Sequence, residues 1–364
     1  MSGPETLGFL IVGPGKVAHT HAGALSDLPG ARLAAVCGRN AERTAAFAAQ
    51  YGARPYTDLA EALQARDVHA VILCTPHPLH ADAAVQAARA GKHVFVEKPL
   101  ALTVRDADRM IAAARDSGVR LGVVSQRRLY EPVQRVKRAL LDGKVGRPVL
   151  GTLSLLGWRG PEYYAMDAWR GTWAGEGGGV LVNQAVHQLD LLQWFMGPLE
   201  EVSGAWANLN HPEIEVEDTA VATLRFAGGA LGSVVVSNSQ NPGLWGRVHV
   251  HGESGRAVGV QTDGGSSFVA GVTAAVEPPV NDVWTVPGEG DLLPTWQAED
   301  RERAARLDVM THYHRLQLED FVEAVRENRE PLVPGEEGRK TVELIEAIYR
   351  AGRTRRVVRL PLGG

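Results

Sequence analysis

One lysine and one histidine stand where residues of their type do acid–base chemistry. Lys98 ends an expected strand, and His187 lies on an expected helix, four residues after Asn183 and three before Asp190. The three helical positions share one face of a helix. An unperturbed imidazole titrates near pH 6.5, so His187 is a candidate general acid/base at neutral pH. The oxidation of a secondary alcohol needs a base for the hydroxyl proton, and Lys98 supplies a positive charge for the oxygen.

Each of these assignments has a plainer alternative. A lone histidine on a helix is more often a buried histidine with satisfied hydrogen bonds, and a lysine at a strand end is more often exposed to solvent. Asp190 either holds the His187 ring in orientation or caps local backbone. Asn183 orients a hydroxyl group but does not accept a proton at neutral pH. We expect Lys98, His187, Asn183 and Asp190 to form the catalytic group.

A glycine-rich turn stands where a nucleotide phosphate binds. The apolar run 7–12 is followed at once by Gly13-Pro14-Gly15-Lys16-Val17-Ala18. Gly13 permits the tight bend, Gly15 lets a pyrophosphate approach the backbone, and Ala18 lets the following helix pack closely on the strand. The N-terminus of that helix adds N–H groups and a partial positive charge. The turn predicts dinucleotide binding, with an ordinary strand-to-helix turn as the alternative.

The end of the second expected strand bears on the choice between NAD and NADP. It reads Val36-Cys37-Gly38-Arg39-Asn40, without the acidic residue that usually binds the ribose hydroxyls. The small Gly38 leaves room for a 2′-phosphate, and Arg39 compensates its charge. The sequence therefore favours NADP. NAD is the alternative, with Arg39 capping the next helix or stacking on adenine.

The elements that position these residues alternate between strands and helices in the first third of the chain. Apolar runs predict strands at 7–12, 33–37, near 56, 68–74, 93–97 and 120–125. Helical patterns lie between them, at about 16–28, 41–51, 58–65, 78–90 and 105–117. This alternation predicts an α/β fold with a doubly wound parallel sheet, strand order 3-2-1-4-5. We place this Rossmann dinucleotide-binding domain at residues 1–125.

The carboxyl ends of these strands are the expected binding crevice, because ligands of open parallel sheets bind there. The residues expected to contact the cofactor are Gly13, Gly15, Lys16, Val17, Ala18, Gly38, Arg39, Asn40, Thr75, Pro76, His77, His80, Glu97, Lys98 and Gln126. Cys37 and Cys74 end the second and fourth strands, roughly 9 to 10 Å apart. That separation excludes a disulfide, and neither thiol has the setting of a nucleophile.

A second domain, at residues 126–364, has a different pattern. We predict helices at 131–141, 179–196, 316–327 and 338–351, and strands at 149–156, 219–226, 230–237 and 248–250. Strands that alternate polar and apolar residues form antiparallel sheets with one face packed on helices. The domain is therefore expected to be α+β.

The segment 158–173 is rich in aromatic and arginine side chains. Aromatic faces stack on sugar C–H groups and arginine binds hydroxyls or carboxylates, so the segment suits a carbohydrate or polyol substrate. The expected substrate contacts are Trp169, Arg170, Asn183, Arg128 and Tyr164, with Trp158, Arg159 and Tyr163 as further members of the segment. For each of them the alternative is a packed loop that covers the core.

Four motifs follow one another in order. They are the glycine turn, Thr75-Pro76-His77-Pro78-Leu79-His80, Glu97-Lys98-Pro99, and the block from Gly177 to Asp190. With these motifs the sequence resembles, over essentially its whole length, the Gfo/Idh/MocA family of nicotinamide-dependent oxidoreductases. The resemblance implies that Lys98 is the catalytic lysine, with a cis bond to Pro99. It also implies a large, mostly antiparallel sheet in the second domain, whose outer face forms a dimer or tetramer.

The activity implied by this resemblance is that of an NAD(P)-dependent dehydrogenase or reductase. It would move a hydride between nicotinamide and a hydroxyl or carbonyl carbon of a sugar, sugar derivative or polyol. Many sugar and inositol dehydrogenases of the family have aspartate at the position of Asn183, which puts an Asp–His relay in doubt. One alternative is a glycosidase that keeps NAD bound and uses transient oxidation. Another is a sensor without catalysis, which the presence of Lys98 and His187 disfavours.

Composition excludes other classes of protein. The 364 residues are 45% apolar and 22% charged, with a net charge of −4, which argues against disorder and against nucleic-acid binding. Two cysteines, and no signal-peptide pattern in residues 1–6, predict a cytoplasmic protein. No apolar run of about 18 residues spans a membrane. Histidine pairs at 77 and 80, 249 and 251, and 312 and 314 lack a further ligand at metal-binding spacing, so no metal is expected.

Overall fold

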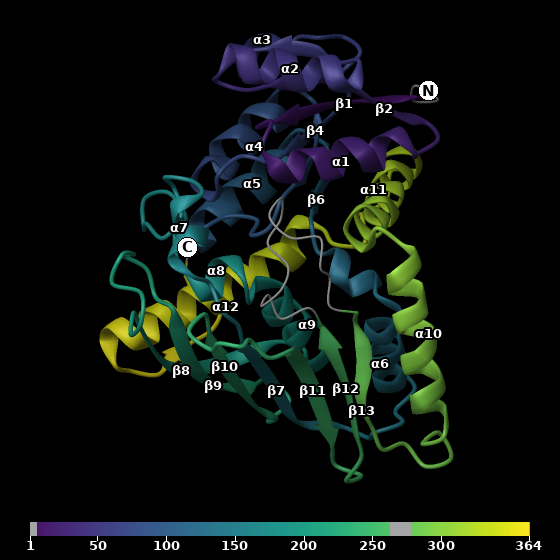
Figure 1. Ribbon diagram of the computed structural model, residues 1–364, viewed down its shortest axis with the longest axis vertical. Coiled ribbons are helices and arrows are strands. Elements are labelled where there is room, and N and C mark those ends of the chain that lie inside the picture. Colours follow the sequence, from purple (N-terminus) through teal and green to yellow (C-terminus); the bar gives the residue numbers. More distant parts are fainter. Residues whose placement is uncertain (1–5, 263–277, 364) are drawn as a thin grey trace. The chain divides into compact units, whose positions relative to one another are not determined.

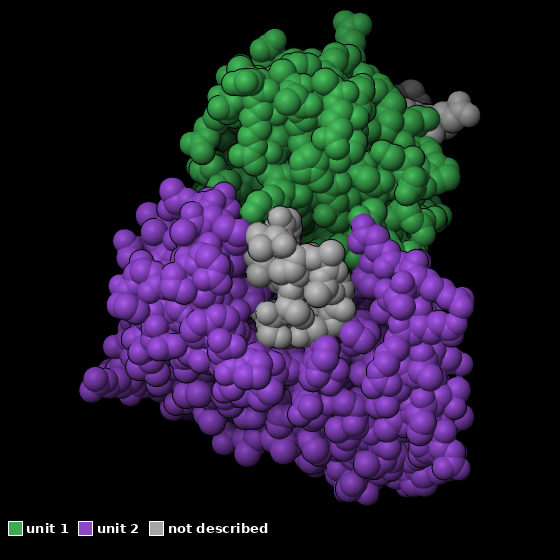
Figure 2. Space-filling model, in the orientation of Figure 1, with its two compact units in different colours: residues 1–126, 310–342, 364 green, residues 127–309, 343–363 purple. Residues whose placement is uncertain are grey.

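The computed structural model describes residues 6–262 and 278–363 (Figure 1). It divides the chain into two compact units, residues 1–126 with 310–342 and residues 127–309 with 343–363 (Figure 2). Residues 310–342 group with the first unit, whereas the sequence pattern placed them in the second domain. Residues 1–5, on which most of the signal-peptide expectation rests, lie outside the described residues.

The first unit contains a six-stranded parallel sheet in the order β3-β2-β1-β4-β5-β6. Its strands are β1 Leu7–Val12, β2 Ala31–Cys37, β3 Arg54–Tyr56, β4 Ala70–Leu73, β5 His93–Val96 and β6 Leu121–Val123. Its helices are α1 Lys16–Ser26, α2 Ala41–Tyr51, α3 Leu59–Leu63, α4 His80–Arg89, α5 Val104–Asp116 and α11 Val309–Glu327. The doubly wound sheet predicted from the alternating pattern is confirmed.

Helices cover both faces of this sheet, which is why β1 is apolar throughout. Leu10 and Val12 belong to a core with α3, α4 and α5. Phe9 and Ile11 point to the opposite core, which contains α1, α2 and α11. A Cβ on Gly122 of β6 would lie 2.8 Å from the Phe321 ring of α11. Glycine therefore lets a helix from near the end of the chain complete the second layer.

The second unit contains an eight-stranded sheet in the order β13-β12-β11-β7-β10-β9-β8-β14. Its strands are β7 Pro148–Leu156, β8 Leu199–Ala207, β9 Thr219–Phe226, β10 Leu231–Ser237, β11 Gly246–Gly252, β12 Ala257–Thr262, β13 Val280–Trp284 and β14 Val358–Arg359. The helices are α6 Glu131–Leu141, α7 Pro161–Ala165, α8 Val180–Asn183, α9 Val186–Met196, α10 Leu292–Arg306 and the part of α12 Gly335–Thr354 that follows Val342. Only β7 and β10 pair in parallel among these described strands, so the mostly antiparallel sheet is confirmed.

The single helix predicted at 179–196 is wrong, because the chain breaks there into α8 and α9. The N–H groups of Gln184 and Ala185 both donate to the Val180 carbonyl, at 3.2 and 2.8 Å. The bond from Ala185 spans five residues, so it widens the last turn and ends α8. Asn183, His187 and Asp190 therefore do not lie on one face of a continuous helix. None of the described helices combines the length and apolar character needed to cross a membrane.

Candidate active site

The glycine turn after β1 has the geometry that a phosphate group needs. Gly13 has a φ of +92°, and a Cβ there would lie 2.8 Å from the Cys74 carbonyl oxygen, so glycine is required. Gly15 precedes α1, whose first turn carries no acidic residue. A Cβ on Gly15 would meet nothing within 4 Å. The partially positive N-terminus of α1 therefore borders open space that suits an anion.

The residues after β2 pack against this turn. A Cβ on Gly38 would lie 2.6 Å from Pro14 Cδ, which explains the glycine without any ligand. Asn40 caps α2 by accepting a hydrogen bond from the Arg43 N–H at 2.8 Å. The Arg43 side chain donates to the Pro14 carbonyl at 2.9 Å, and Arg39 is exposed. Asn40 thus caps the helix, and Arg43 is a second cation at the turn that the sequence patterns did not reveal.

His80 links two loops at the ends of β4 and β5. Its Nδ1 lies 2.9 Å from the Pro99 carbonyl oxygen, and its Nε2 lies 3.0 Å from the Thr75 carbonyl oxygen. Burial lowers the pKa of His80, and a neutral ring donates to one carbonyl at a time. His77 is buried beside it, with ring centroids 5.8 Å apart. These contacts make His80 a positioning residue for the loop of Lys98, whereas the sequence pattern predicted a cofactor contact.

Glu97 is the centre of a buried polar cluster with His21 of α1 and His314 of α11. One Glu97 oxygen lies 2.8 Å from His21 Nε2 and 3.7 Å from His314 Nε2. The other accepts a hydrogen bond from the Lys98 N–H at 3.1 Å. Burial opposes ionisation, but the two histidines hold the pKa of Glu97 well below its usual range. The nitrogen and oxygen atoms of His21, Glu97 and His314 lie within 4.8 Å of one another, a spacing that could also hold a metal ion. His21 and Glu97 are at hydrogen-bond distance from each other, so the cluster is explained without a metal. The ionised carboxylate therefore fixes the backbone of Lys98, which is half-buried.

The first unit also holds buried polar atoms that fit a dinucleotide. Thr75 Oγ1 and Gln126 Oε1 have no hydrogen-bond partner within the described part of the chain. Such atoms are costly to bury unless a ligand or water meets them. Lys16 is exposed in the first turn of α1 and Val17 is half-buried. With the open space at Gly15, these groups suit a cofactor that has phosphates and polar rings.

In the second unit, a buried glutamate fixes the start of α8. Glu217 accepts hydrogen bonds from the N–H groups of Gly179 and Leu181, at 2.9 and 3.1 Å, and from the Tyr349 hydroxyl at 2.9 Å. Burial raises the pKa of Glu217 to about 7. A Cβ on Gly179 would lie 1.8 Å from the Glu217 carbonyl oxygen. The glycine cluster before α8 therefore permits close packing against the start of β9.

Asn183, at the end of α8, is held by side chains from the preceding segment. Its amide nitrogen donates to the Tyr163 hydroxyl at 3.0 Å and to a carboxylate oxygen of Glu176. The same hydroxyl accepts a hydrogen bond from Gln184 Nε2 at 3.0 Å. Glu176 is buried, and its other oxygen accepts from the Gly171 N–H at 2.6 Å. Both N–H groups of the Asn183 amide are thus engaged, and Tyr163 and Glu176 fix its orientation.

His187 and Asp190 lie on α9, where both are buried. Asp190 accepts two hydrogen bonds from Arg128, at 2.9 Å from Nε and 2.6 Å from NH2. The Arg128 guanidinium carbon lies 5.0 Å from the centroid of the Trp194 ring. The sequence pattern left two roles open for Asp190, and the structure adds a third, as counter-ion of Arg128. The Arg128 guanidinium, a predicted substrate contact, is engaged in this buried pair.

The aromatic segment brings several predicted substrate residues around Tyr163. The guanidinium carbon of Arg170 lies 4.3 Å from the Tyr163 ring centroid and 4.6 Å from that of Trp169. Tyr164 is buried, and its hydroxyl accepts a hydrogen bond from Asn238 Nδ2 at 3.3 Å. Trp169, Arg170 and Asn183 thus all contact Tyr163 or its immediate partners. This arrangement of rings and donors is one that recognises polar ligands.

Two domain models of one protein family match this chain. Residues 7–125 match GFO_IDH_MocA, described as the oxidoreductase family with an NAD-binding Rossmann fold. Residues 133–258 match the GFO/IDH/MocA C-terminal domain. The matched ranges include the glycine turn, Lys98 and His187.

Individual relatives extend the similarity over the whole chain. The crystal structure of the WlbA dehydrogenase from Bordetella pertussis, in complex with NADH and UDP-GlcNAcA, is 34% identical, covers 99% of each chain and has a TM-score of 0.85. The aldose-aldose oxidoreductase from Caulobacter crescentus, complexed with glycerol, is 25% identical over 98% of this chain and 100% of its own, with a TM-score of 0.78. The myo-inositol 2-dehydrogenase of Thermotoga maritima is 28% identical over 361 residues, 96% of this chain and 97% of its own.

Proposed function

The chain belongs to the GFO/IDH/MocA family of NAD-binding oxidoreductases, and we propose that it transfers a hydride between nicotinamide and a hydroxyl or carbonyl carbon of a sugar, sugar derivative or polyol. The main support within the structure is the buried Glu97 cluster, which holds Lys98 in a unit whose glycine turn fits a dinucleotide. The relatives described above are named as dehydrogenases or oxidoreductases. They favour this activity over an NAD-dependent glycosidase or a sensor.

We assign proton transfer to His187 and stabilisation of the substrate oxygen to Lys98. When bound, the nicotinamide supplies the hydride acceptor or donor. In the oxidation direction, the neutral His187 imidazole takes the hydroxyl proton, and the Lys98 ammonium stabilises the negative charge that develops on the oxygen. Asn183 orients a substrate hydroxyl from the position that Tyr163 and Glu176 give it.

The remaining predicted residues of the first unit hold the cofactor. We assign the pyrophosphate to the backbone of the turn at Gly13 and Gly15 and to the first turn of α1, and a polar contact each to Thr75 and Gln126, whose buried oxygens lack partners among the described residues. We assign substrate contacts in the second unit to Trp169, Arg170 and Tyr164. The domains at residues 1–125 and 126–364 are thereby proposed to divide cofactor binding from substrate binding and assembly.

We further propose a preference for NADP(H) over NAD(H). Arg39 is exposed at the end of β2 with no carboxylate partner among the described residues, and Arg43 adds a second guanidinium at the adjoining turn. Two guanidinium groups suit a 2′-phosphate. Calorimetric titration with NADPH and NADH tests this preference. Equal affinities, or tighter binding of NADH, would contradict it.

The outer face of the second sheet suits a homo-oligomer, a dimer or a tetramer. Val221 pairs with Val235 across β9 and β10, and Leu150 pairs with Leu231 across β7 and β10. These four side chains are 37% to 50% exposed, so they form an apolar stripe of the kind that interfaces bury. Size-exclusion chromatography with light scattering tests the assembly. We expect Val221→Glu to reduce the mass to that of one chain, and a monomeric wild type would contradict the proposal.

The two cysteines have no part in the proposed reaction. Both are unpaired, and burial raises the pKa of each thiol, that of Cys37 to about 11. Thiols of this kind are poor nucleophiles. Unpaired cysteines suit a reducing compartment, so we propose a cytoplasmic location, which cell fractionation tests.

A screen of cofactor reduction tests the main proposal. The purified chain is mixed with NAD⁺ or NADP⁺ and a panel of aldoses, sugar acids, nucleotide-linked sugars and polyols, and the absorbance of the reduced cofactor is followed. We expect net reduction with at least one compound. Cleavage of glycosides without net reduced cofactor would favour the glycosidase instead. Binding of sugars with neither reaction would favour the sensor.

A further inference from the structure

Arg159, between β7 and α7, is a buried arginine that has no carboxylate partner among the described residues. It is 6% exposed, its NH1 donates to the neighbouring Trp158 carbonyl at 2.8 Å, and its other side-chain partner is the neutral Tyr163. Its Nε has no hydrogen-bond partner in the part of the chain that the structure describes. Burial lowers the pKa of Arg159. The side chains that interact with its guanidinium are those of Tyr163, Tyr164 and Arg170, and none of them is a carboxylate. A guanidinium keeps its charge in proteins, so burial without an anion is costly.

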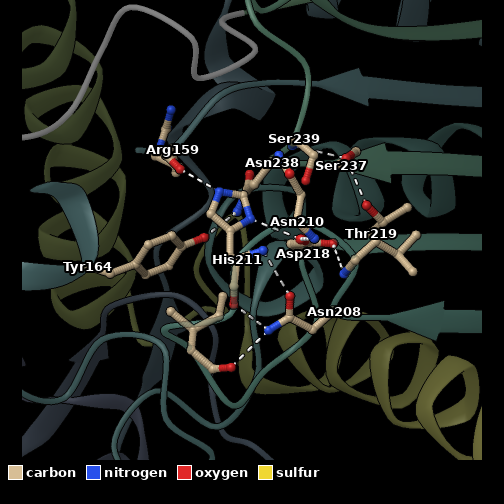
Figure 3. A network of polar contacts seen from close by, with 12 residues as sticks. Arg159, Tyr164, Asn208, Asn210, His211, Asp218, Thr219, Ser237, Asn238 and Ser239 are labelled. Atoms are coloured by element: carbon tan, nitrogen blue, oxygen red, sulfur yellow. Dashed lines mark hydrogen bonds and ion pairs between the residues drawn. The ribbon is translucent and has the colours of Figure 1, made fainter. Parts of the chain in front are cut away.

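The main chain of Arg159 is fixed by a polar network. Its N–H donates to the Asn238 carbonyl at 3.1 Å, and its carbonyl oxygen lies 2.7 Å from His211 Nε2. His211 Nδ1 lies 2.9 Å from Asp218. Figure 3 shows the Arg159 carbonyl turned toward the His211 ring while the side chain extends away from it. The network engages the backbone and not the guanidinium, which is how a scaffold presents a binding group in a fixed position.

A second guanidinium approaches the same aromatic ring. The guanidinium carbons of Arg159 and Arg170 lie 5.2 and 4.3 Å from the ring centroid of Tyr163. Arg170 has one ion pair, with Asp167 at 3.2 Å, whose side chain is 36% exposed. The other nearby carboxylate, Glu176, accepts hydrogen bonds from Asn183 and from a backbone N–H. In the part of the chain that the structure describes, the two arginines thus share one ring, and the solvent-accessible Asp167 is their single acidic partner.

We propose that Arg159 and Arg170 together bind a carboxylate of the substrate, so that the enzyme acts on sugars that carry an acid group. This inference rests on the proposed function and narrows its substrate class. The planar N–H fork of a guanidinium matches a carboxylate in geometry and charge. Asn183, a predicted contact of the substrate hydroxyls, donates to the hydroxyl of the same Tyr163. The two arginines therefore bind the acid group of the sugar, and the neighbouring Asn183 orients its hydroxyls.

Matched pairs of ligands test the charge preference. The NADH-loaded chain is titrated with D-glucuronate against D-glucose, and with UDP-glucuronate against UDP-glucose, and glucose 6-phosphate is included as a phosphate probe. We expect the acid of at least one pair to bind about tenfold or more tightly than its neutral partner, as charge-assisted hydrogen bonds imply. Equal affinities in both pairs would overturn the proposal. So would tight binding of glucose 6-phosphate without any preference for the two carboxylates.

Arginine variants test whether these two residues cause the preference. Arg159→Gln and Arg170→Gln should each abolish most of the preference for the acid over its neutral partner, because each removes one guanidinium. Arg159→Lys should keep part of it, because it retains the charge but not the fork. The matched control is Arg353→Gln, since Arg353 also stacks on aromatic rings of the second unit, 5.6 Å from that of Trp173. NADH affinity reports folding in every variant. A preference that survives both glutamine variants would contradict the assignment.

Failure of this inference and failure of the proposed function are distinguishable. If the chain reduces its cofactor with neutral sugars as well as with acids, hydride transfer stands and the carboxylate site is wrong. If no sugar reduces the cofactor, but the acid preference and its loss in the arginine variants are observed, the binding site stands and the enzymatic proposal is wrong.

Discussion

The two units position their functional groups in different ways. In the first unit, Gly13, Thr75 and Lys98 follow β1, β4 and β5, which are neighbours in the sheet. The topology of the sheet brings these residues to one edge. In the second unit, Asn183 and Arg159 are fixed by hydrogen bonds from side chains and loops distant in the sequence. A site at the ends of strands depends on a few backbone positions. A site held by a hydrogen-bond network depends on every side chain that takes part in the network.

The same contrast appears in two buried glutamates. Glu97 in the first unit meets two histidines, which keep its pKa low. Glu217 in the second unit meets backbone N–H groups and one tyrosine, and burial raises its pKa to about 7. Histidine side chains that hydrogen-bond to the carboxylate therefore favour its ionised form in one unit, while backbone N–H groups and a tyrosine leave desolvation dominant in the other. The two units are expected to respond to pH in opposite directions.

The largest expected effect is on turnover, and it involves one residue from each unit. Lys98→Met and His187→Ala should each lower kcat by about 10²–10⁴-fold, the usual contribution of a positioned proton-transfer group. NADH affinity and melting temperature should change little. Lys340→Met and His251→Ala are the controls, one in each unit. Unchanged turnover in either active-site variant would refute that residue's role.

The next largest effect is on the stability that Glu97 provides. Glu97→Gln should lower the free energy of unfolding by about 1–3 kcal/mol at pH 7, since it removes the buried carboxylate that accepts hydrogen bonds from the His21 ring and the Lys98 N–H. The folded pKa of Glu97 is below its unfolded value, so its contribution is fully present above about pH 4.3 and is lost as the pH falls through the folded pKa. Urea unfolding at pH 7 and pH 4 measures this. If the loss of unfolding free energy in Glu97→Gln were larger at pH 4 than at pH 7, the assigned role of Glu97 would be contradicted. Glu253→Gln, at an exposed glutamate, is the control.

Glu217 should show the reverse dependence. Its folded pKa of about 7 lies above the unfolded value, so its contribution is fully present below about pH 4.3 and is lost as the pH rises through 7. Relative to wild type, Glu217→Gln should therefore gain about 1–3 kcal/mol of unfolding free energy between pH 5 and pH 8. Urea unfolding across this range tests the sign. A parallel pH profile for the two proteins would mean that Glu217 does not titrate in this range.

Two glycine variants separate folding from cofactor binding in the first unit. Gly15→Ala should weaken NADH binding about tenfold, about 1.4 kcal/mol, and leave the melting temperature unchanged, because its Cβ meets nothing within 4 Å. Gly13→Ala should lower stability by about 1–3 kcal/mol, because its φ is +92°. Titration calorimetry and thermal unfolding measure both. Normal NADH affinity in Gly15→Ala would show that no phosphate approaches this backbone.

The smallest expected effect concerns the choice of cofactor. Arg39→Ala should weaken NADPH binding by about 3–10-fold and leave NADH binding unchanged, because an exposed ion pair contributes little. Arg66→Ala is the control, since Arg66 is also exposed in the first unit. Fluorescence titration with the two cofactors distinguishes the cases. An equal loss for both would assign Arg39 to the adenine or to the helix.

Local patterns predicted much of the fold. The bounds of α2, α6 and β9 match the predicted ranges 41–51, 131–141 and 219–226, because hydrophobic period and capping residues act within a few positions. The break between α8 and α9 was not predicted, since it depends on Tyr163 and Glu176 holding Asn183. The apolar patterns of β8, β12, β13 and α10 were likewise not recognised as elements.

The sequence by itself determined the family, the doubly wound sheet and the positions of the turn and of Lys98, because strand ends and glycine spacing are encoded locally. Only the tertiary structure decided that α11 completes the first unit, that His21 and His314 hold Glu97, and that Arg159 is buried with no carboxylate partner among the described residues. Those facts depend on which side chains far apart in the chain meet. A buried charge acquires its partners only when the core closes around it.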